Sequence, residues 1–276
     1  FYTTYYLQEV LGSDLDDTFS EWATNGYSNG ETDEDDRKKA PHEALRSIAA
    51  PYFQKRNQLI DRGNRSQRFE LQREIETDLL AAFDYEVDPM LKELRDGRWL
   101  PVLAQVNKPD GTPALCVIEA PPVESDDDVD PLEQTLSPAQ FENVLPEYAG
   151  PNAARDAFDT SRNRPLRTPI VELITQGLFA LDEPPRWVIV VNASQVILID
   201  RSKWPQKRML RFELDEILSR KNTDTLKAVA ALLHRRSTCP DEGFSLLDTF
   251  DENSHKHAFE VSEELKYALR ESIELL

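Results

Sequence analysis

WLPVLAQVNKPDGTPALCVIEAPP, residues 99–122, is the stretch that decides the fold. Two apolar runs, Leu100–Val106 and Ala114–Ala120, flank a segment rich in Pro, Asp and Gly, a composition typical of the turn of an antiparallel hairpin. The second run is apolar almost throughout, which predicts a strand that is buried on both faces. A buried strand rarely ends in a carboxylate unless another group pairs with it, so Glu119 is the first candidate for a functional residue.

A hairpin whose second strand ends in a Glu resembles the core of the PD-(D/E)xK nucleases, which occur at the N-termini of restriction enzymes. In that family an Asp in the first strand and a Glu-x-Lys in the second hold Mg²⁺ and assist the attacking water. Here the Pro-Asp falls on Pro101-Val102 and the Glu-x-Lys on Glu119-Ala120-Pro121, so the Asp and the Lys are both missing. The resemblance implies a nuclease-like fold without a metal site, and we expect no catalysis by this chain.

Two further residues match the nuclease family without completing its site. Asp110, in the turn, could replace the missing ligand, although Pro-Asp-Gly is also what an ordinary turn requires. Gln176 falls where the helix of related nuclease domains carries a Gln that faces the active site. The resemblance thus implies Glu119, Asp110 and Gln176 as vestigial nuclease positions. The alternative that stays open is a live Mg²⁺ nuclease that uses Asp110, Glu119 and a displaced Lys such as Lys108.

Length and composition fit a folded protein with a sizeable core. The chain has 276 residues, of which 39% are hydrophobic and 30% charged. No run reaches the length of a membrane span, and neither a signal peptide nor a disulfide framework is present, so we expect a cytoplasmic protein without membrane contact. The net charge of −19 repels a nucleic-acid backbone at long range, so contact with DNA requires a local basic surface.

The expected order of elements is helix, hairpin, helix, hairpin. The helices are Arg65–Phe83 and Pro169–Ala180, and the second hairpin consists of Trp187–Asn192 and Val196–Asp200. This order predicts an α/β fold in which both hairpins share one mixed sheet with helices on either side. The expected division of the chain is a helical arm with an acidic loop (1–64), the nuclease-like domain (65–211), and a helical extension that leads into a downstream domain (212–276).

Charged residues on the helices before the first hairpin are interpreted as solvated, with a phosphate-binding surface as the alternative. A helix is expected over His42–Asn64, broken at Pro51, and it precedes the helix that starts at Arg65. Glu74 or Glu76 could supply a carboxylate, as the leading helix of the nuclease family does, but exposed glutamates are the commoner case. The cations of this region are Lys55, Arg56, Arg62, Arg65, Arg68 and Arg73.

A basic segment, Arg201–Arg211, follows the second hairpin and is expected to be a loop. It contains five cations and one tryptophan, which could grip a phosphate backbone and stack on a base. Equally, the tryptophan could cap the sheet while the cations pair with acidic runs. The candidate nucleic-acid-binding residues are Arg201, Lys203, Trp204, Lys207 and Arg208. No metal site is expected, because the alternating Asp126, Asp128 and Asp130 lack the Gly and the closing Glu of a calcium loop.

The run DENSHKHAFEVSEELKYALRESIELL, residues 251–276, resembles the segment that leads into the catalytic domain of Eco57I-type, Type IIG-like adenine-N6 DNA methyltransferases. Some of these belong to phage-defence systems such as DISARM and BREX, others to restriction-modification systems. The chain has neither their Gly-rich S-adenosylmethionine loop nor their Asn-Pro-Pro-Tyr-type tetrapeptide. The resemblance implies that catalysis and S-adenosylmethionine binding lie downstream of Leu276.

Three functions remain open on the sequence alone. The first is a non-catalytic domain of such a methyltransferase, which engages DNA or contacts partner subunits of a defence system and needs no cofactor itself. The second is the live Mg²⁺ nuclease. The third is an acidic module that binds a basic partner protein or mimics DNA, which the net charge of −19 fits equally well.

Overall fold

The computed structural model describes residues 10–25, 39–61, 64–95, 97–122, 129–142, 168–240 and 243–256, together with Tyr2, Tyr6, Val144 and Ala258. Residues 26–38, within the arm and acidic loop expected at 1–64, lie outside these residues, as do residues 123–128 and residues 259–276 of the expected helical extension.

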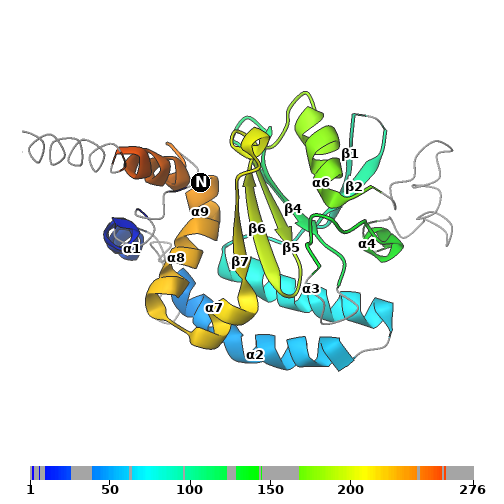
Figure 1. The fold of residues 1–276 in the computed structure, drawn as a ribbon, viewed down its shortest axis with the longest axis horizontal. Coiled ribbons are helices and arrows are strands. Elements are labelled where there is room, and N and C mark those ends of the chain that lie inside the picture. The colour runs from blue at the N-terminus through cyan, green and yellow to red at the C-terminus, as the bar shows by residue number, and fades with distance from the viewer. Residues whose placement is uncertain are drawn as a thin grey trace, which may run out of the picture.

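A five-stranded mixed sheet forms the centre of the molecule (Figure 1). The strand order is β3-β4-β5-β6-β7, in which β4 and β5 are parallel and all other neighbours antiparallel. The mixed α/β architecture is therefore confirmed, and β4 lies inside the sheet rather than at its edge. The strands are β3 (Ala104–Asn107), β4 (Pro113–Glu119), β5 (Trp187–Val191), β6 (Gln195–Asp200) and β7 (Met209–Glu213).

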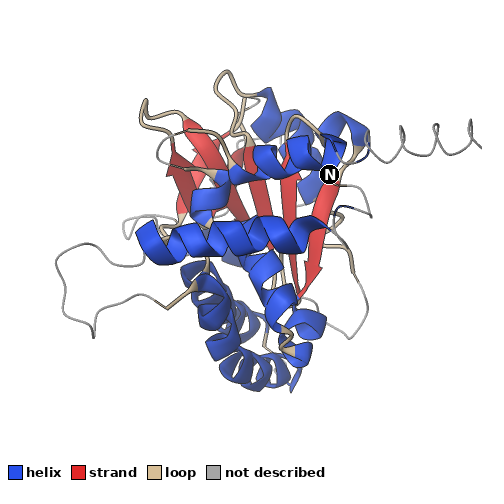
Figure 2. Cartoon of the chain, turned by 90° about the vertical axis from the view of Figure 1, so that its left-hand side faces the viewer, coloured by secondary structure: helices blue, strands red, loops and turns tan. Residues whose placement is uncertain are grey.

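Helices pack around the strands of this sheet (Figure 2). Asn64 and Asn222 begin two of them, because each side chain accepts a hydrogen bond from a backbone N–H of the first turn. The helices are α1 (Leu11–Asn25), α2 (Pro41–Asp61), α3 (Arg65–Ala82), α4 (Pro138–Glu142), α6 (Ile170–Glu172), which continues as a π-helix (Leu173–Gly177) and a 3₁₀ turn (Leu178–Ala180), α7 (Leu214–Arg220), α8 (Thr223–Leu233) and α9 (Arg235–Thr238). Residues 246–256 are helical as well.

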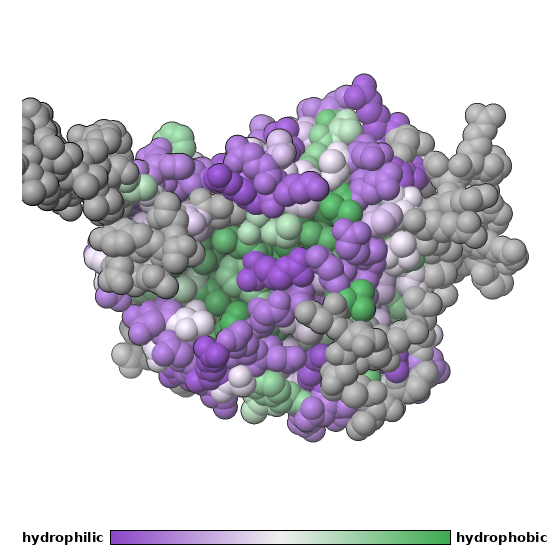
Figure 3. Space-filling view, viewed as in Figure 1, coloured by the Kyte–Doolittle hydropathy of each residue, from purple (hydrophilic) through white to green (hydrophobic). Residues whose placement is uncertain are grey.

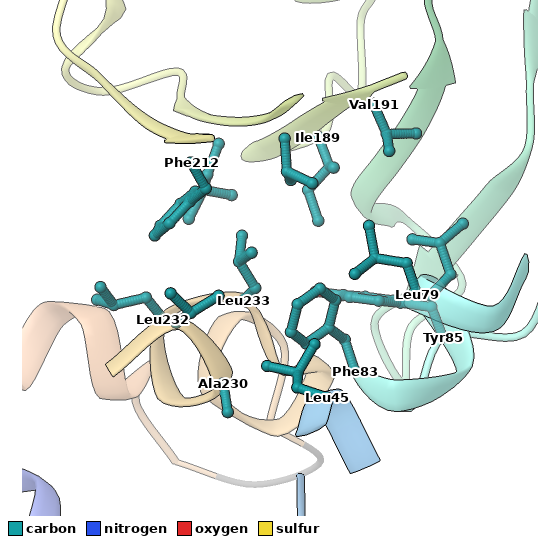
Figure 4. Packing of buried hydrophobic residues seen from close by; sticks show 14 of the residues in the cluster. Leu45, Leu79, Phe83, Tyr85, Ile189, Val191, Phe212, Ala230, Leu232 and Leu233 are labelled. Atoms are coloured by element: carbon teal, nitrogen blue, oxygen red, sulfur yellow. The ribbon is translucent and has the colours of Figure 1, made fainter. Parts of the chain in front are cut away.

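Alternate residues of each central strand enter two hydrophobic clusters, one on each face of the sheet. Leu115 and Val117 of β4 pack with α2, α3 and α8, whereas Cys116 and Ile118 pack with the helical segment 170–180. Figure 4 shows the first cluster, where side chains of β5 and β7 meet those of α3 and α8. Because both faces are covered, the near-continuous apolar sequence of β4 is explained.

Three expectations require correction. The strand expected at Leu100–Val106 bends at Leu103, so that its first half, β2 (Trp99–Val102), pairs with β1 (Met90–Glu93) in a separate two-stranded sheet. The end of the basic segment is the edge strand β7 rather than loop. Helix α2 is continuous through Pro51, whose ring is exposed. One hydrophobic cluster contains residues from all three expected segments of the chain.

Hydrophobic residues gather in the middle of one face, over the strands of the sheet, with hydrophilic residues around them (Figure 3). Among the helices that the structure describes, none combines the length and the hydrophobicity that crossing a membrane would require.

Candidate functional site

The end of β4 places a carboxylate in the interior of the protein. Glu119 is the last residue of the strand and is only 3% exposed. Because it alternates with Leu115 and Val117, its side chain lies on the face of the sheet that α3 covers. The expectation that this carboxylate needs a pairing group is met by α3.

Arg73 of α3 binds Glu119 through both carboxylate oxygens. Its Nε lies 3.2 and 3.1 Å from the Oε1 and Oε2 of Glu119, and its Nη2 lies 2.8 Å from Oε2. The Arg73 side chain is 17% exposed and that of Glu119 4%, so the pair lies close to the surface but with little contact with water. Arg73 is thus not a solvated helix residue, and a bidentate guanidinium–carboxylate pair of this kind is geometrically specific.

Two glutamine side chains hold the backbone at the same point. Gln72 donates from Nε2 to the carbonyl of Ala120 at 2.8 Å, and Gln140 of α4 donates from Nε2 to the carbonyl of Glu119 at 2.6 Å. The Oε1 of Gln140 in turn accepts from the backbone N–H of Ser137 at 2.6 Å. Both glutamines are buried, so these bonds satisfy carbonyl groups that water cannot reach.

Glu76 adds a second buried carboxyl group, one helical turn after Gln72 and Arg73. It is 1% exposed, and its carboxyl group lies beside the side chains of Glu119 and Gln72. Burial raises the pKa of Glu76 well above its usual range, and repulsion from Glu119 raises it further. Burial also raises the pKa of Glu119, while Arg73 opposes that change. The expectation that Glu76 is exposed is therefore wrong, whereas the Glu74 side chain is 60% exposed.

These residues do not fit the Mg²⁺ ion that the nuclease family binds. Both oxygens of Glu119 already accept from Arg73. Val102, which matches the family's Asp, belongs to the hydrophobic cluster on the opposite face of the sheet, and Pro121, which matches its Lys, is buried. In the part of the chain that is described, no three His, Cys, Asp or Glu side chains come together as a metal site would require.

The other vestigial positions lie elsewhere. Asp110 is in the turn that precedes β4, at the far end of the strand from Glu119, and its side chain accepts from the backbone N–H and the hydroxyl of Thr112 at 2.9 and 2.6 Å. Gln176 is exposed in the π-helix on the opposite face of the sheet from α3. Glu119, Asp110 and Gln176 are therefore not brought together. Lys108 of the alternative nuclease site lies with Asp110 in the turn.

The basic segment separates into buried and exposed residues. Trp204 is buried in the second hydrophobic cluster and donates from Nε1 to the Thr175 hydroxyl at 2.9 Å, so it does not offer a face for base stacking. Lys203 lies 2.6 Å from Asp251. Arg201, Lys207 and Arg208 are exposed.

Comparison with known proteins adds no relative: no family model, no curated protein and no solved structure matches the chain. Sequence reasoning found Glu119 but missed its partners Arg73, Gln72 and Gln140. The spacing of Gln72, Arg73 and Glu76 on one turn of α3, among apolar residues, is the signal that could have indicated a buried polar cluster.

Proposed function

We propose that this chain is a catalytically silent, nuclease-like module of an adenine-N6 DNA methyltransferase that acts in phage defence or restriction-modification, where it engages DNA or contacts partner subunits. The methyltransferase part rests on the resemblance of residues 251–276 and on the order of the predicted elements. S-adenosylmethionine would be bound by the parent protein, outside these residues.

The bidentate pair of Arg73 and Glu119 is the observation that best supports a nuclease-like module without catalysis. A carboxylate at the end of an inner strand, with a second carboxyl from the helix that precedes the hairpin, is the arrangement in which a nuclease binds its metal. In this chain the guanidinium of Arg73 binds the carboxylate of Glu119 instead. The charge that a metal ion would compensate is thus compensated by the protein itself.

Cleavage of plasmid DNA with Mg²⁺ or Mn²⁺ tests the absence of catalysis. The wild-type chain should leave supercoiled plasmid intact, and Glu119→Gln should behave identically. Cutting by the wild type that disappears in Glu119→Gln would overturn the proposal in favour of an active Mg²⁺ nuclease.

The methyltransferase part has a separate test. The coding sequence after residue 276 should contain an Asn-Pro-Pro-Tyr-type motif and a Gly-rich S-adenosylmethionine loop. If the reading frame ends near residue 276, or continues without these motifs, the acidic interaction module becomes the better explanation of the net charge of −19.

A further inference from the structure

A cavity of about 550 Å³ lies at the end of the sheet opposite Glu119. Its lining includes Ala114, the second residue of β4, and Trp187, the first residue of the parallel strand β5, whereas Glu119 ends β4. Its sides come from the turn between β3 and β4 and from the segment that follows α8. This volume is in the range of sites that bind small ligands.

Three cations line the cavity. Arg186 is held against the ring of Trp187, with its guanidinium carbon 4.6 Å from the ring centroid, and it binds Asp248 and Asp200. Those bonds use three of its five N–H donors, which leaves donors for a ligand. Arg235 lines the cavity as well, with its Nε 3.6 Å from Asp84. Lys108 is exposed and forms no salt bridge with any residue that the structure describes.

An exposed aromatic residue adjoins the lining of the cavity without forming part of it. Phe244 is 90% exposed and stands between Gly243 and Ser245, both of which line the cavity. Pro109 and Pro240 add apolar surface to the walls. A phenylalanine so exposed is available for stacking on a planar ring, and flat apolar walls suit the same kind of group.

Carboxylates near the cavity reduce its positive charge and therefore its attraction for anions. Asp200 and Asp248 neutralise much of the charge of Arg186, and Asp84 that of Arg235, so attraction for a bare anion is weak. Asp110 also lines the cavity and can accept a hydrogen bond from a hydroxyl group. The combination of cation, carboxylate, apolar wall and aromatic ring suits a ligand with a phosphate, hydroxyl groups and a flat base.

We propose that this cavity binds a nucleotide, with the phosphate at Lys108 and Arg186, a ribose hydroxyl at Asp110 and the base against Phe244. The nucleotide comes either free or as one residue of a single DNA strand. The exposed cations Arg201, Lys207 and Arg208 follow β6 at the same end of the sheet, where they can contact the phosphates of a strand (Figure 1). The site does not involve Glu119; binding of a free nucleotide is independent of the proposed function, whereas binding of a DNA strand rests on the DNA engagement proposed there.

Calorimetric titration of the whole chain with AMP, inorganic phosphate and a single-stranded oligonucleotide tests the proposal. AMP should bind, and inorganic phosphate should bind at least about tenfold more weakly because it lacks the base. Lys108→Glu and Phe244→Ala should each weaken AMP binding about tenfold, through loss of a charge-assisted hydrogen bond and of stacking respectively. Both residues are exposed, so the variants should fold normally.

Matched controls are Lys39→Glu, which places the same charge change at an exposed site away from the cavity lining, and Val129→Ala, which truncates another exposed apolar residue. Both should bind AMP as the wild type does. Tighter binding of the oligonucleotide than of AMP would assign the site to a DNA strand, and the reverse to a free nucleotide. Absence of AMP and oligonucleotide binding at millimolar concentration, or binding that Lys108→Glu and Phe244→Ala leave unchanged, would overturn the proposal.

Discussion

The two ends of the central sheet differ in whether their polar groups are buried or exposed. At the C-terminal end of β4, the carboxylates and amides of Glu119, Glu76, Gln72 and Gln140 are buried, and Arg73 engages both oxygens of Glu119. At the N-terminal end of β4 and β5, Lys108 and Asp110 are exposed beside a cavity of about 550 Å³. The same strands thus end in a closed polar cluster on one side and in an open one on the other. Glu119, which resembles a catalytic residue in sequence, is here buried in the fold. The exposed polar groups instead belong to the turn of Lys108 and Asp110, which has no catalytic motif.

The largest expected effect concerns the closed end. Arg73→Ala leaves the buried carboxylate of Glu119 without its cation, and breaking a buried ion pair from one side costs about 3–5 kcal/mol. Urea unfolding at pH 7 measures the loss. Replacing Glu119 by Gln in the same variant should recover part of the stability, because the uncompensated charge is then gone.

Arg220→Ala is the matched control, since it removes an exposed pair with Glu216. It should cost less than about 0.5 kcal/mol. An Arg73→Ala variant as stable as this control would mean that the polar cluster at the end of β4 does not depend on the ion pair.

Trp204→Ala should be nearly as damaging, although Trp204 lies in the segment first considered for base stacking. Its ring packs in the second hydrophobic cluster, and truncating a buried aromatic residue costs about 3–5 kcal/mol. Thermal unfolding of Trp204→Ala and Trp204→Phe distinguishes packing from the hydrogen bond to Thr175, because the second variant keeps most of the ring. Unchanged stability together with weaker single-strand binding would restore the stacking interpretation.

Glu76→Gln should stabilise the protein at neutral pH, by about 1–3 kcal/mol. Burial and Glu119 raise the pKa of Glu76, so the folded state holds a proton that the unfolded state releases near pH 4.3. The wild type should therefore lose stability as the pH rises from about 4.3 through the higher pKa of the folded state. Denaturant titrations between pH 4 and 9 should show this decline in the wild type and a smaller one in Glu76→Gln. A steeper decline in the variant would contradict the assignment.

The smallest effect on stability is expected at the open end. Arg201, Lys207 and Arg208 are exposed, so changing all three to Glu should alter the unfolding free energy by no more than a few tenths of a kcal/mol for each residue. If these three cations contact phosphates, the plot of log affinity against log salt for a single strand should be less steep in the variant than in the wild type, by about 2. Lys203 is left unchanged because it pairs with Asp251. Equal slopes for the variant and the wild type would leave these cations without a role in DNA contact.

Periodicity sufficed to predict the architecture but not the site. The apolar runs at β4, β5 and β6 are long and bounded by turn residues, which is why the mixed sheet and its inner strand were predictable. Strand β7 was missed because it is a short edge strand that directly follows a segment rich in cations. The bend at Leu103 was missed because nothing in the apolar run marks where pairing changes from β1 to β4.

The polar cluster was only half predictable, since its members are distant in sequence. Glu119 stands out by itself as a carboxylate at the end of an apolar strand, but Arg73 precedes it by 46 residues and Gln140 follows it by 21. Only the packing of α3 and α4 against the strand end brings them together. Trp204 could not be assigned from the sequence because an amphipathic ring suits a turn and a core equally well.

Hydrogen–deuterium exchange of the whole chain, with and without a saturating single-stranded oligonucleotide and in the presence of Mg²⁺, tests the contrast between the two ends most directly. Protection is expected at residues 107–113, 201–209 and 243–246, which border the cavity and the exposed cations. Residues 72–76 and 117–121, which form the closed cluster around Glu119, should exchange at the same rate in both states. Protection confined to residues 72–76 and 117–121 would contradict the account, because the closed end would then be the one that binds.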